Sequence, residues 1–140
     1  MKNIFFLTCL FIAFQAGAQT PSFIGTWKGS EKGKYVYLTF YADSTFEMVD
    51  GKDTMSGKTL SGVFEEPVTT SFTVDTSARP MHLDLIIKTV KAGKPVNTML
   101  GIFEYAGSNK IRLRFDTSYG LRPKNFLPKG NEDTMIFVKQ

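Results

Sequence analysis

Near its start the chain reads Phe23-Ile24-Gly25-Thr26-Trp27, an apolar step into a glycine followed by the single tryptophan of the 140 residues. Short apolar runs and turn residues alternate after it, so we interpret residues 23–28 as the first strand of an antiparallel sheet that closes on itself. A large ring such as Trp27 buries much apolar area, and we expect it to plug one end of that sheet.

The rest of the chain predicts about nine short strands, because apolar residues recur at every second position between turn signals. Residues 34–42, the turn Asp43-Ser44 and residues 45–50 predict a first hairpin. The strongest alternation lies in residues 81–90, and further strands are predicted at 60–65, 70–75, 97–105, 110–116 and 134–139. Residues 51–58 are predicted to be a polar connection, and the 3.6-residue period of a helix is not evident.

These elements predict an all-β fold, an up-and-down antiparallel β-barrel of about eight or nine strands. A β-sandwich is the alternative architecture. We favour the barrel because consecutive hairpins with short loops place each strand beside the next, and closure removes exposed sheet edges.

The N-terminus has the composition of a secretory signal peptide: Lys2, an apolar run over residues 4–14, and the small residues Ala16 and Ala18. We expect cleavage after Ala18, which divides the chain into a signal over residues 1–18 and one domain over residues 19–140. The protein is then exported to the periplasm or secreted. The only cysteine, Cys9, leaves with the signal, so no disulfide or thiolate remains.

Composition limits the classes of function. The 13 phenylalanines and five tyrosines can form a core without disulfides. The net charge of +4 includes Lys2, and the basic residues are dispersed along the sequence. This distribution does not match the basic stripe of a nucleic-acid-binding protein. We expect a monomer that binds no nucleic acid and has no membrane-spanning segment once the signal is removed.

The segments Phe23 to Lys28 and Phe40 to Phe46 resemble the opening of lipocalin-like domains, whose first strand carries a glycine-x-tryptophan signature. The second half is similar to uncharacterised secreted bacterial proteins of that set, through Leu83-Asp84-Leu85, Gly101-Ile102-Phe103-Glu104-Tyr105, Ile111-Arg112-Leu113 and Arg122-Pro123. The resemblance implies a small barrel with at most a binding function. It also implies that Trp27 packs against a cationic side chain, for which Arg122 and Arg114 are the candidates.

Aromatic residues on strand faces predict that the barrel mouth holds a small hydrophobic or amphipathic molecule. We expect its lining to be drawn from six residues: Tyr37, Phe40, Phe46, Phe64, Leu85 and Phe103. Trp27 and Arg122 are expected to be structural, with Arg122 holding the last loop. The face of Tyr35, Tyr37 and Tyr41 is open to three interpretations: a partner surface, a cavity lining, or a shield beneath a loop.

We predict no enzyme activity, no cofactor and no metal site. The single histidine, His82, has Asp84 on its own strand face, and we expect that pair to face solvent. Ser30, Ser44 and Ser61 are not in the context of a nucleophile elbow, and Glu65-Glu66 point to opposite faces. The alternative function is a protein-interaction module, such as an inhibitor or an envelope assembly factor, with a packed barrel and a working rim at residues 50–58 or 117–130.

Overall fold

A computed structural model of the protein describes residues 22–31, 33–115, 120–127 and 134–140. Nine strands and one short helix follow one another in these residues: β1 (Gly25–Glu31), β2 (Lys34–Phe40), β3 (Phe46–Asp50), β4 (Asp53–Met55), α1 (Gly57–Val63), β5 (Val68–Asp75), β6 (Met81–Thr89), β7 (Pro95–Tyr105), β8 (Lys110–Phe115) and β9 (Thr134–Lys139). The predicted signal, residues 1–18, lies outside the described residues.

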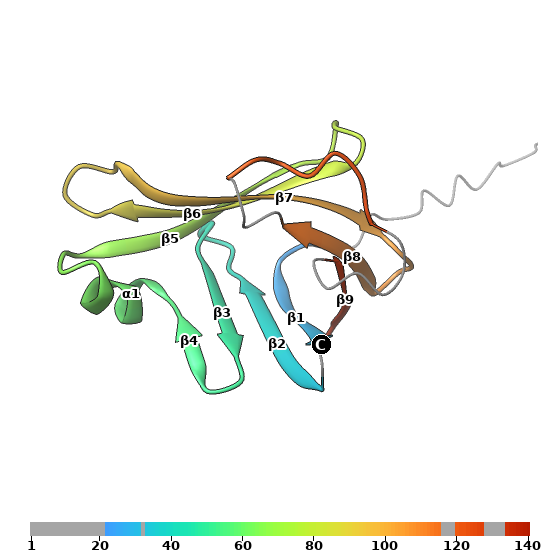
Figure 1. Ribbon diagram of the computed structural model, residues 1–140, viewed down its shortest axis with the longest axis horizontal. Helices are drawn as coiled ribbons and strands as arrows, with labels where there is room; N and C mark the ends of the chain where they lie inside the picture. Colours follow the sequence, from blue (N-terminus) through green and yellow to red (C-terminus); the bar gives the residue numbers. More distant parts are fainter. Residues whose placement is uncertain (1–21, 32, 116–119, 128–133) are drawn as a thin grey trace, which may run out of the picture.

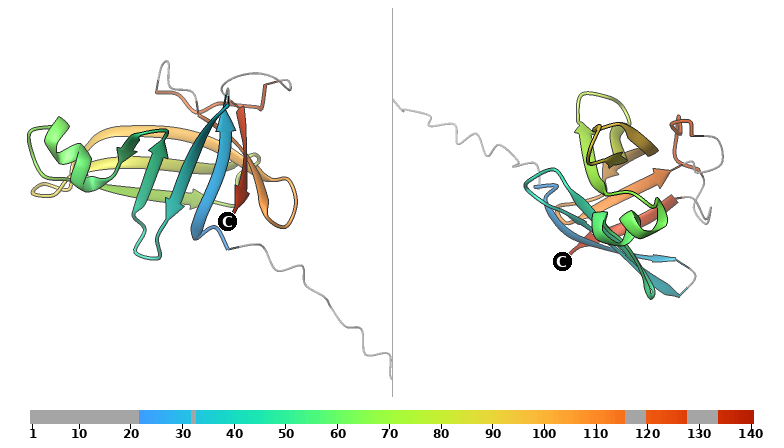
Figure 2. Two further views of the ribbon diagram at one scale, coloured as in Figure 1. Left: turned by 90° about the horizontal axis from the view of Figure 1, so that it is seen from below. Right: turned by 90° about the vertical axis from the view of Figure 1, so that its left-hand side faces the viewer.

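All strand pairs are antiparallel, and the sheet has the order β4-β3-β2-β1-β9-β8-β7-β6-β5. Each strand except β4 therefore lies beside its successor, and β1 joins the two halves of the chain by pairing with β9. The sheet curls into a half-barrel whose interruption falls between β4 and β5 (Figures 1 and 2). The expected all-β, up-and-down antiparallel class is confirmed.

Across that interruption the two ends of the sheet approach each other without forming a ladder. The Phe72 backbone N–H donates to the Ser44 carbonyl at 2.9 Å, and the Thr70 hydroxyl donates to the Phe46 carbonyl at 2.6 Å. Farther along, α1 lies between β4 and β5, as the view from below shows (Figure 2). We call this part of the wall the seam.

The core lies on the concave face of the sheet. Residues directly opposite one another on paired strands share a face, and the buried ones form continuous rows. Trp27 stands opposite Leu38, and Leu83 stands opposite Gly101. One cluster on this face contains Trp27, Val36, Leu38, Phe40, Phe46, Phe72, Leu83, Leu85, Phe103, Ile111, Leu113 and Phe137.

Two glycines on the concave face allow aromatic rings to approach the backbone closely. A Cβ at Gly29 would lie 2.8 Å from the Phe137 ring, and one at Gly101 would lie 2.5 Å from the Phe115 ring. Each glycine is directly opposite the aromatic residue that covers it. The missing side chains thus let neighbouring strands bury a ring where the sheet curls.

The predicted strand at residues 60–65 is wrong, because this segment forms α1. Ser56 is the N-cap, and Ser56 and Thr59 form a reciprocal capping box in which each side chain accepts from the other's backbone N–H. The Ser61 hydroxyl donates to the Gly57 carbonyl and accepts from the Val68 N–H at 3.0 Å, which ties the helix to β5. The residues just before it, predicted as a connection, contain β4. No helix in the described part of the chain is long and apolar enough to cross a membrane.

Candidate functional site

The structure separates the six residues that we expected to line one cavity. Phe40, Phe46, Leu85 and Phe103 are at most 2% exposed and belong to the core cluster. Tyr37 lies on the opposite, convex face of β2, and Phe64 is the C-cap of α1. The four core residues contact other side chains on the concave face.

Aromatic rings meet across the interior at one end of the half-barrel. The Phe23 ring, just before β1, has its centroid 4.6 Å from that of Phe40 and 5.1 Å from that of Phe103. Phe40 and Phe72, from opposite sides of the seam, are 4.8 Å apart in an edge-to-face arrangement. This end of the interior is therefore filled by side chains.

Trp27 is fully buried beneath Phe23, and its indole N–H donates to the Phe23 carbonyl at 2.8 Å. The cation over its ring is the Lys139 ammonium, 5.4 Å from the centroid, which also donates to the Ser22 carbonyl. Our two sequence candidates for this position lie elsewhere. The Arg114 guanidinium donates to the Asn125 carbonyl at 2.7 Å, and Arg122 lies on the convex face.

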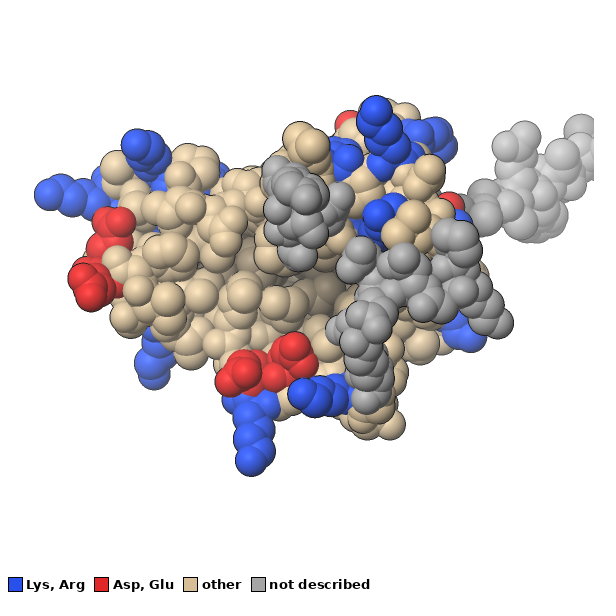
Figure 3. All heavy atoms as spheres, in the orientation of Figure 1, with Lys and Arg blue, Asp and Glu red and all other residues tan. Residues whose placement is uncertain are grey.

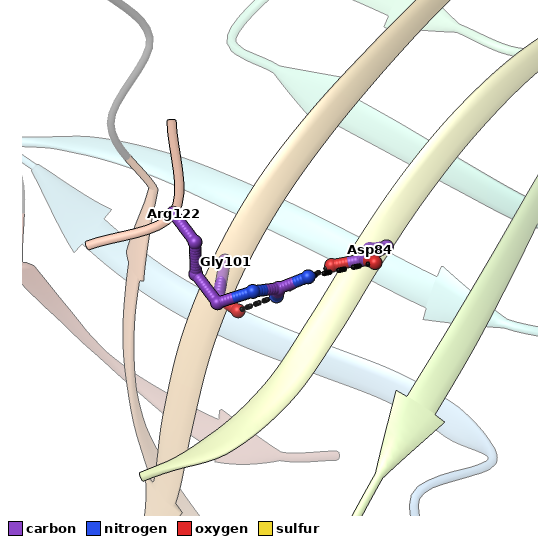
Figure 4. A network of polar contacts seen from close by, with 3 residues as sticks. All are labelled: Asp84, Gly101 and Arg122. Carbon is purple, nitrogen blue, oxygen red and sulfur yellow. Dashed lines mark hydrogen bonds and ion pairs between the residues drawn. The ribbon is translucent and has the colours of Figure 1, made fainter. Parts of the chain in front are cut away.

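Arg122 clamps residues 120–127 onto the convex face of β6 and β7 (Figure 4). Its two terminal nitrogens donate to the two carboxylate oxygens of Asp84 at 2.6 and 2.9 Å, and Nη1 also donates to the Gly101 carbonyl at 2.7 Å. The side chains of Arg122 and Asp84 are 24% and 21% exposed. Through these bonds Arg122 anchors residues 120–127 to β6 and β7.

His82 is not paired with Asp84, its neighbour on the same strand face, because both carboxylate oxygens of Asp84 accept from Arg122. Asp75, on β5, is directly opposite His82. The Ser77 hydroxyl and backbone N–H lower the pKa of Asp75, and His82 adds a small effect of the same sign. Within the described residues, no group of three or more His, Cys, Asp and Glu is placed to hold a metal ion.

The tyrosine face is on the outside of the sheet. Tyr35 and Tyr41 are 53% and 44% exposed, and the Lys28 ammonium lies 3.8 Å from the centroid of the Tyr35 ring. Tyr37 is half-buried, and the centroid of its ring lies 5.7 Å from the Lys28 ammonium. These rings line no cavity on the concave face.

A hollow of about 240 Å³ opens on the concave face beside the seam, and we call it the seam pocket. Its wall is mainly apolar and is formed by Met48 on β3, Met55 on β4 and Leu60 on α1. Met48 is directly opposite both Leu38 and Met55, so the pocket continues the row that begins at Trp27. Its remaining lining residues are Asp50, Asp53 and Thr54.

Local structure explains why these side chains meet. Gly51 has φ +61°, which permits the tight turn that pairs Asp50 with Asp53 and folds β4 back onto β3. The capping box at Ser56 then starts α1 immediately after β4, and the Thr59 hydroxyl donates to the Thr54 carbonyl at 2.7 Å. Leu60 is thereby brought over the two methionines.

A second hollow, of about 680 Å³, is more polar and is lined by Thr76, Arg79, Met81, Glu104 and Tyr105. The Arg79 guanidinium there donates to the Thr76 and Ala78 carbonyls of its own loop, and Arg112 pairs with Glu104 at 2.5 Å. Its charged side chains already have partners within the protein, so the seam pocket is the better candidate for a ligand.

None of the seam-pocket residues is among the six predicted ligand residues, because residues 51–58 are predicted as a connection and Leu60 as part of a strand. Residues 50–58, which include four of the pocket residues, are predicted only as the rim of an interaction module. Two signals were available. Ser56 and Thr59 have capping-box spacing, and Met48 and Met55 are equidistant from the Gly51-Lys52 turn. Together these patterns predict a hairpin followed at once by a helix.

Comparisons with protein-family models, with curated proteins and with solved structures found no match to this chain.

Proposed function

We propose that the protein is an exported, lipocalin-like carrier that binds a small hydrophobic or amphipathic molecule in the seam pocket. The observation that carries the proposal is the apolar hollow formed by Met48, Met55 and Leu60 on the concave face. Apolar concavities with a few polar groups at one side are the usual form of small-molecule sites. The lipocalin-like assignment is supported by the curled antiparallel sheet and by the buried tryptophan of its first strand.

The pocket suits a ligand smaller than a typical drug. Drug-sized ligands occupy pockets of roughly 300 Å³ or more, against about 240 Å³ here. Burial of each methylene contributes about 0.8 kcal/mol. Adding two methylenes to a straight-chain ligand should therefore tighten binding by about 15-fold while the chain still fits.

The proposal is tested by methyl NMR on protein labelled with ¹³C at the methionine methyl groups. Titration with hexanol should shift the Met48 and Met55 signals, and butanol should bind about 15-fold more weakly. The signals of Met81 and Met135, on other strands, should stay in place.

Leu60→Glu should abolish the shifts, because it puts a charge into the apolar wall. Val63→Glu is the matched control: it lies on the same helix but is 72% exposed, and it should bind hexanol as the unaltered protein does. If Met48 and Met55 do not respond to hexanol, or if both variants behave alike, the pocket is not a binding site.

A second candidate, a protein-interaction module, is favoured by the rings that meet across the interior between Phe23, Phe40, Phe72 and Phe103. Part of the rim first considered for it, residues 117–119 and 128–130, lies outside the described residues. Native mass spectrometry of protein purified from its own host distinguishes the two. A co-purifying small molecule supports carriage, whereas ligand-free protein bound to another protein supports interaction.

A further inference from the structure

Two carboxylates stand at the open edge of the seam pocket. Asp50 and Asp53 are directly opposite each other on β3 and β4, and both are pocket-lining and exposed. Neither side chain has an ion pair or a hydrogen bond within the part of the chain that the structure describes. Like charges placed directly opposite each other in a sheet repel, so a cation between them would relieve that repulsion.

The carboxylate pair and the apolar wall lie along one line. On the same face, the pair Asp50 and Asp53 is followed two residues farther along by the pair Met48 and Met55. Two residues of a strand span about 6.6 Å. A molecule with a positive head between the carboxylates would therefore lay a short chain over the two methionines and against Leu60.

The surface view shows where the charges near the pocket lie. Figure 3 shows a group of acidic atoms at the lower margin of this face, where Figure 1 places the hairpin of β3 and β4, with uncharged surface above it and basic atoms below and beside it. The nearest basic residue in the sequence is Lys52, at the tip of that turn, and it forms no ion pair with either carboxylate.

From this arrangement we infer that the ligand of the seam pocket is a cationic amphiphile, an ammonium group on a short alkyl chain. The inference rests on the proposed function of the pocket and adds the sign of charge that the pocket selects. The ammonium lies between the Asp50 and Asp53 carboxylates, and the chain contacts the thioether and isobutyl side chains.

The test compares three probes of equal chain length, hexylamine, hexanol and hexanoate, in titrations followed by the methionine methyl signals. At neutral pH and low salt, hexylamine should bind about tenfold more tightly than hexanol, since an exposed ion pair contributes roughly threefold per carboxylate. Hexanoate should bind more weakly than hexanol. Added salt should reduce the preference for the amine, because it screens exposed charges.

The double variant Asp50→Asn, Asp53→Asn should bring hexylamine to the affinity of hexanol and leave hexanol unchanged. Glu47→Gln is the matched control, because Glu47 is on β3 but faces the convex side, opposite Thr39. That variant should keep the full preference for the amine.

Each failure is distinguishable. If the three probes bind equally well, or if the double variant keeps the preference for hexylamine, the cationic class is wrong while binding in the pocket stands. If none of the probes moves the Met48 and Met55 signals, the proposed function fails and this inference fails with it.

Discussion

Replacing Arg122 with alanine should lower the free energy of unfolding by about 2 kcal/mol. Breaking a fully buried ion pair costs about 3–5 kcal/mol, and an exposed pair contributes about 0.2–1 kcal/mol. With side chains 24% and 21% exposed, Arg122 and Asp84 lie between these limits. The substitution also removes a charged donor from the Gly101 carbonyl. For a domain of this size, 2 kcal/mol corresponds to a fall in Tm of roughly 6 °C.

Urea unfolding followed by tryptophan fluorescence measures this cost, since Trp27 is the only tryptophan and is fully buried. Asp84→Asn and the double variant complete a thermodynamic cycle, and we expect a coupling energy of about 1.5 kcal/mol. Glu104→Gln is the comparison, because it removes the ion pair with Arg112, whose side chains are 38% and 43% exposed, and leaves the Arg112 cation over the Phe126 ring. Its pair should contribute about 0.5 kcal/mol.

A coupling energy near zero between Arg122 and Asp84, or equal losses of stability in Arg122→Ala and Glu104→Gln, would show that Arg122 does not anchor residues 120–127. Limited proteolysis adds an independent readout. If the Arg122 clamp holds residues 120–127 on the sheet, trypsin should cleave after Lys124 faster in Arg122→Ala than in Glu104→Gln, at urea concentrations where both remain folded.

Gly29→Ala should destabilise the protein by about 1–3 kcal/mol in urea, because the new methyl group would overlap the Phe137 ring. Gly62→Ala, on α1 with no atom near its Cβ position, should instead stabilise the protein by about 0.4–1 kcal/mol. Equal losses of stability in the two variants would contradict a close approach of the Phe137 ring to Gly29. The Ser77 hydrogen bonds hold the pKa of Asp75 below its ordinary 3.8, so this carboxylate stabilises the fold above pH 3.8 and the contribution disappears as pH falls through the lowered pKa. Ser77→Ala should raise the pKa of Asp75 toward 3.8 in a carboxyl-carbon NMR titration, and an unchanged value would refute the assignment.

Much of the fold could be predicted from local pattern. Residues 81–88 alternate between apolar and polar side chains except at Ile86, and the structure has β6 there as Met81–Thr89, with every second side chain buried from Leu83 onward. The amphipathic stretch at 110–116 became β8, Lys110–Phe115, with Ile111 and Leu113 inside. Alternation identifies such strands because successive side chains point to opposite faces of any sheet, whatever its partners.

The pattern was misleading where local hydrogen bonds outweighed it. Leu60, Gly62 and Phe64 alternate as in a strand, yet Ser56 and Thr59 cap a helix over them and Ser61 fastens it to Val68. Six residues with a glycine among them carry too little periodicity to separate the two structures. The pocket then depends on α1, so an error at this one element concealed the candidate site.

By itself the sequence determined eight of the nine strands, the main turns between them, and that aromatic side chains supply much of the core. Only the tertiary structure decided that the tyrosines face outward and that the Lys139 ammonium lies over Trp27. It also decided that Arg122 binds Asp84, and that Asp50 and Asp53 lie at the edge of an apolar hollow. These features join residues far apart in the chain or depend on which way the sheet curls. The alternation of side chains within a single strand specifies neither how the sheet curls nor where the seam lies.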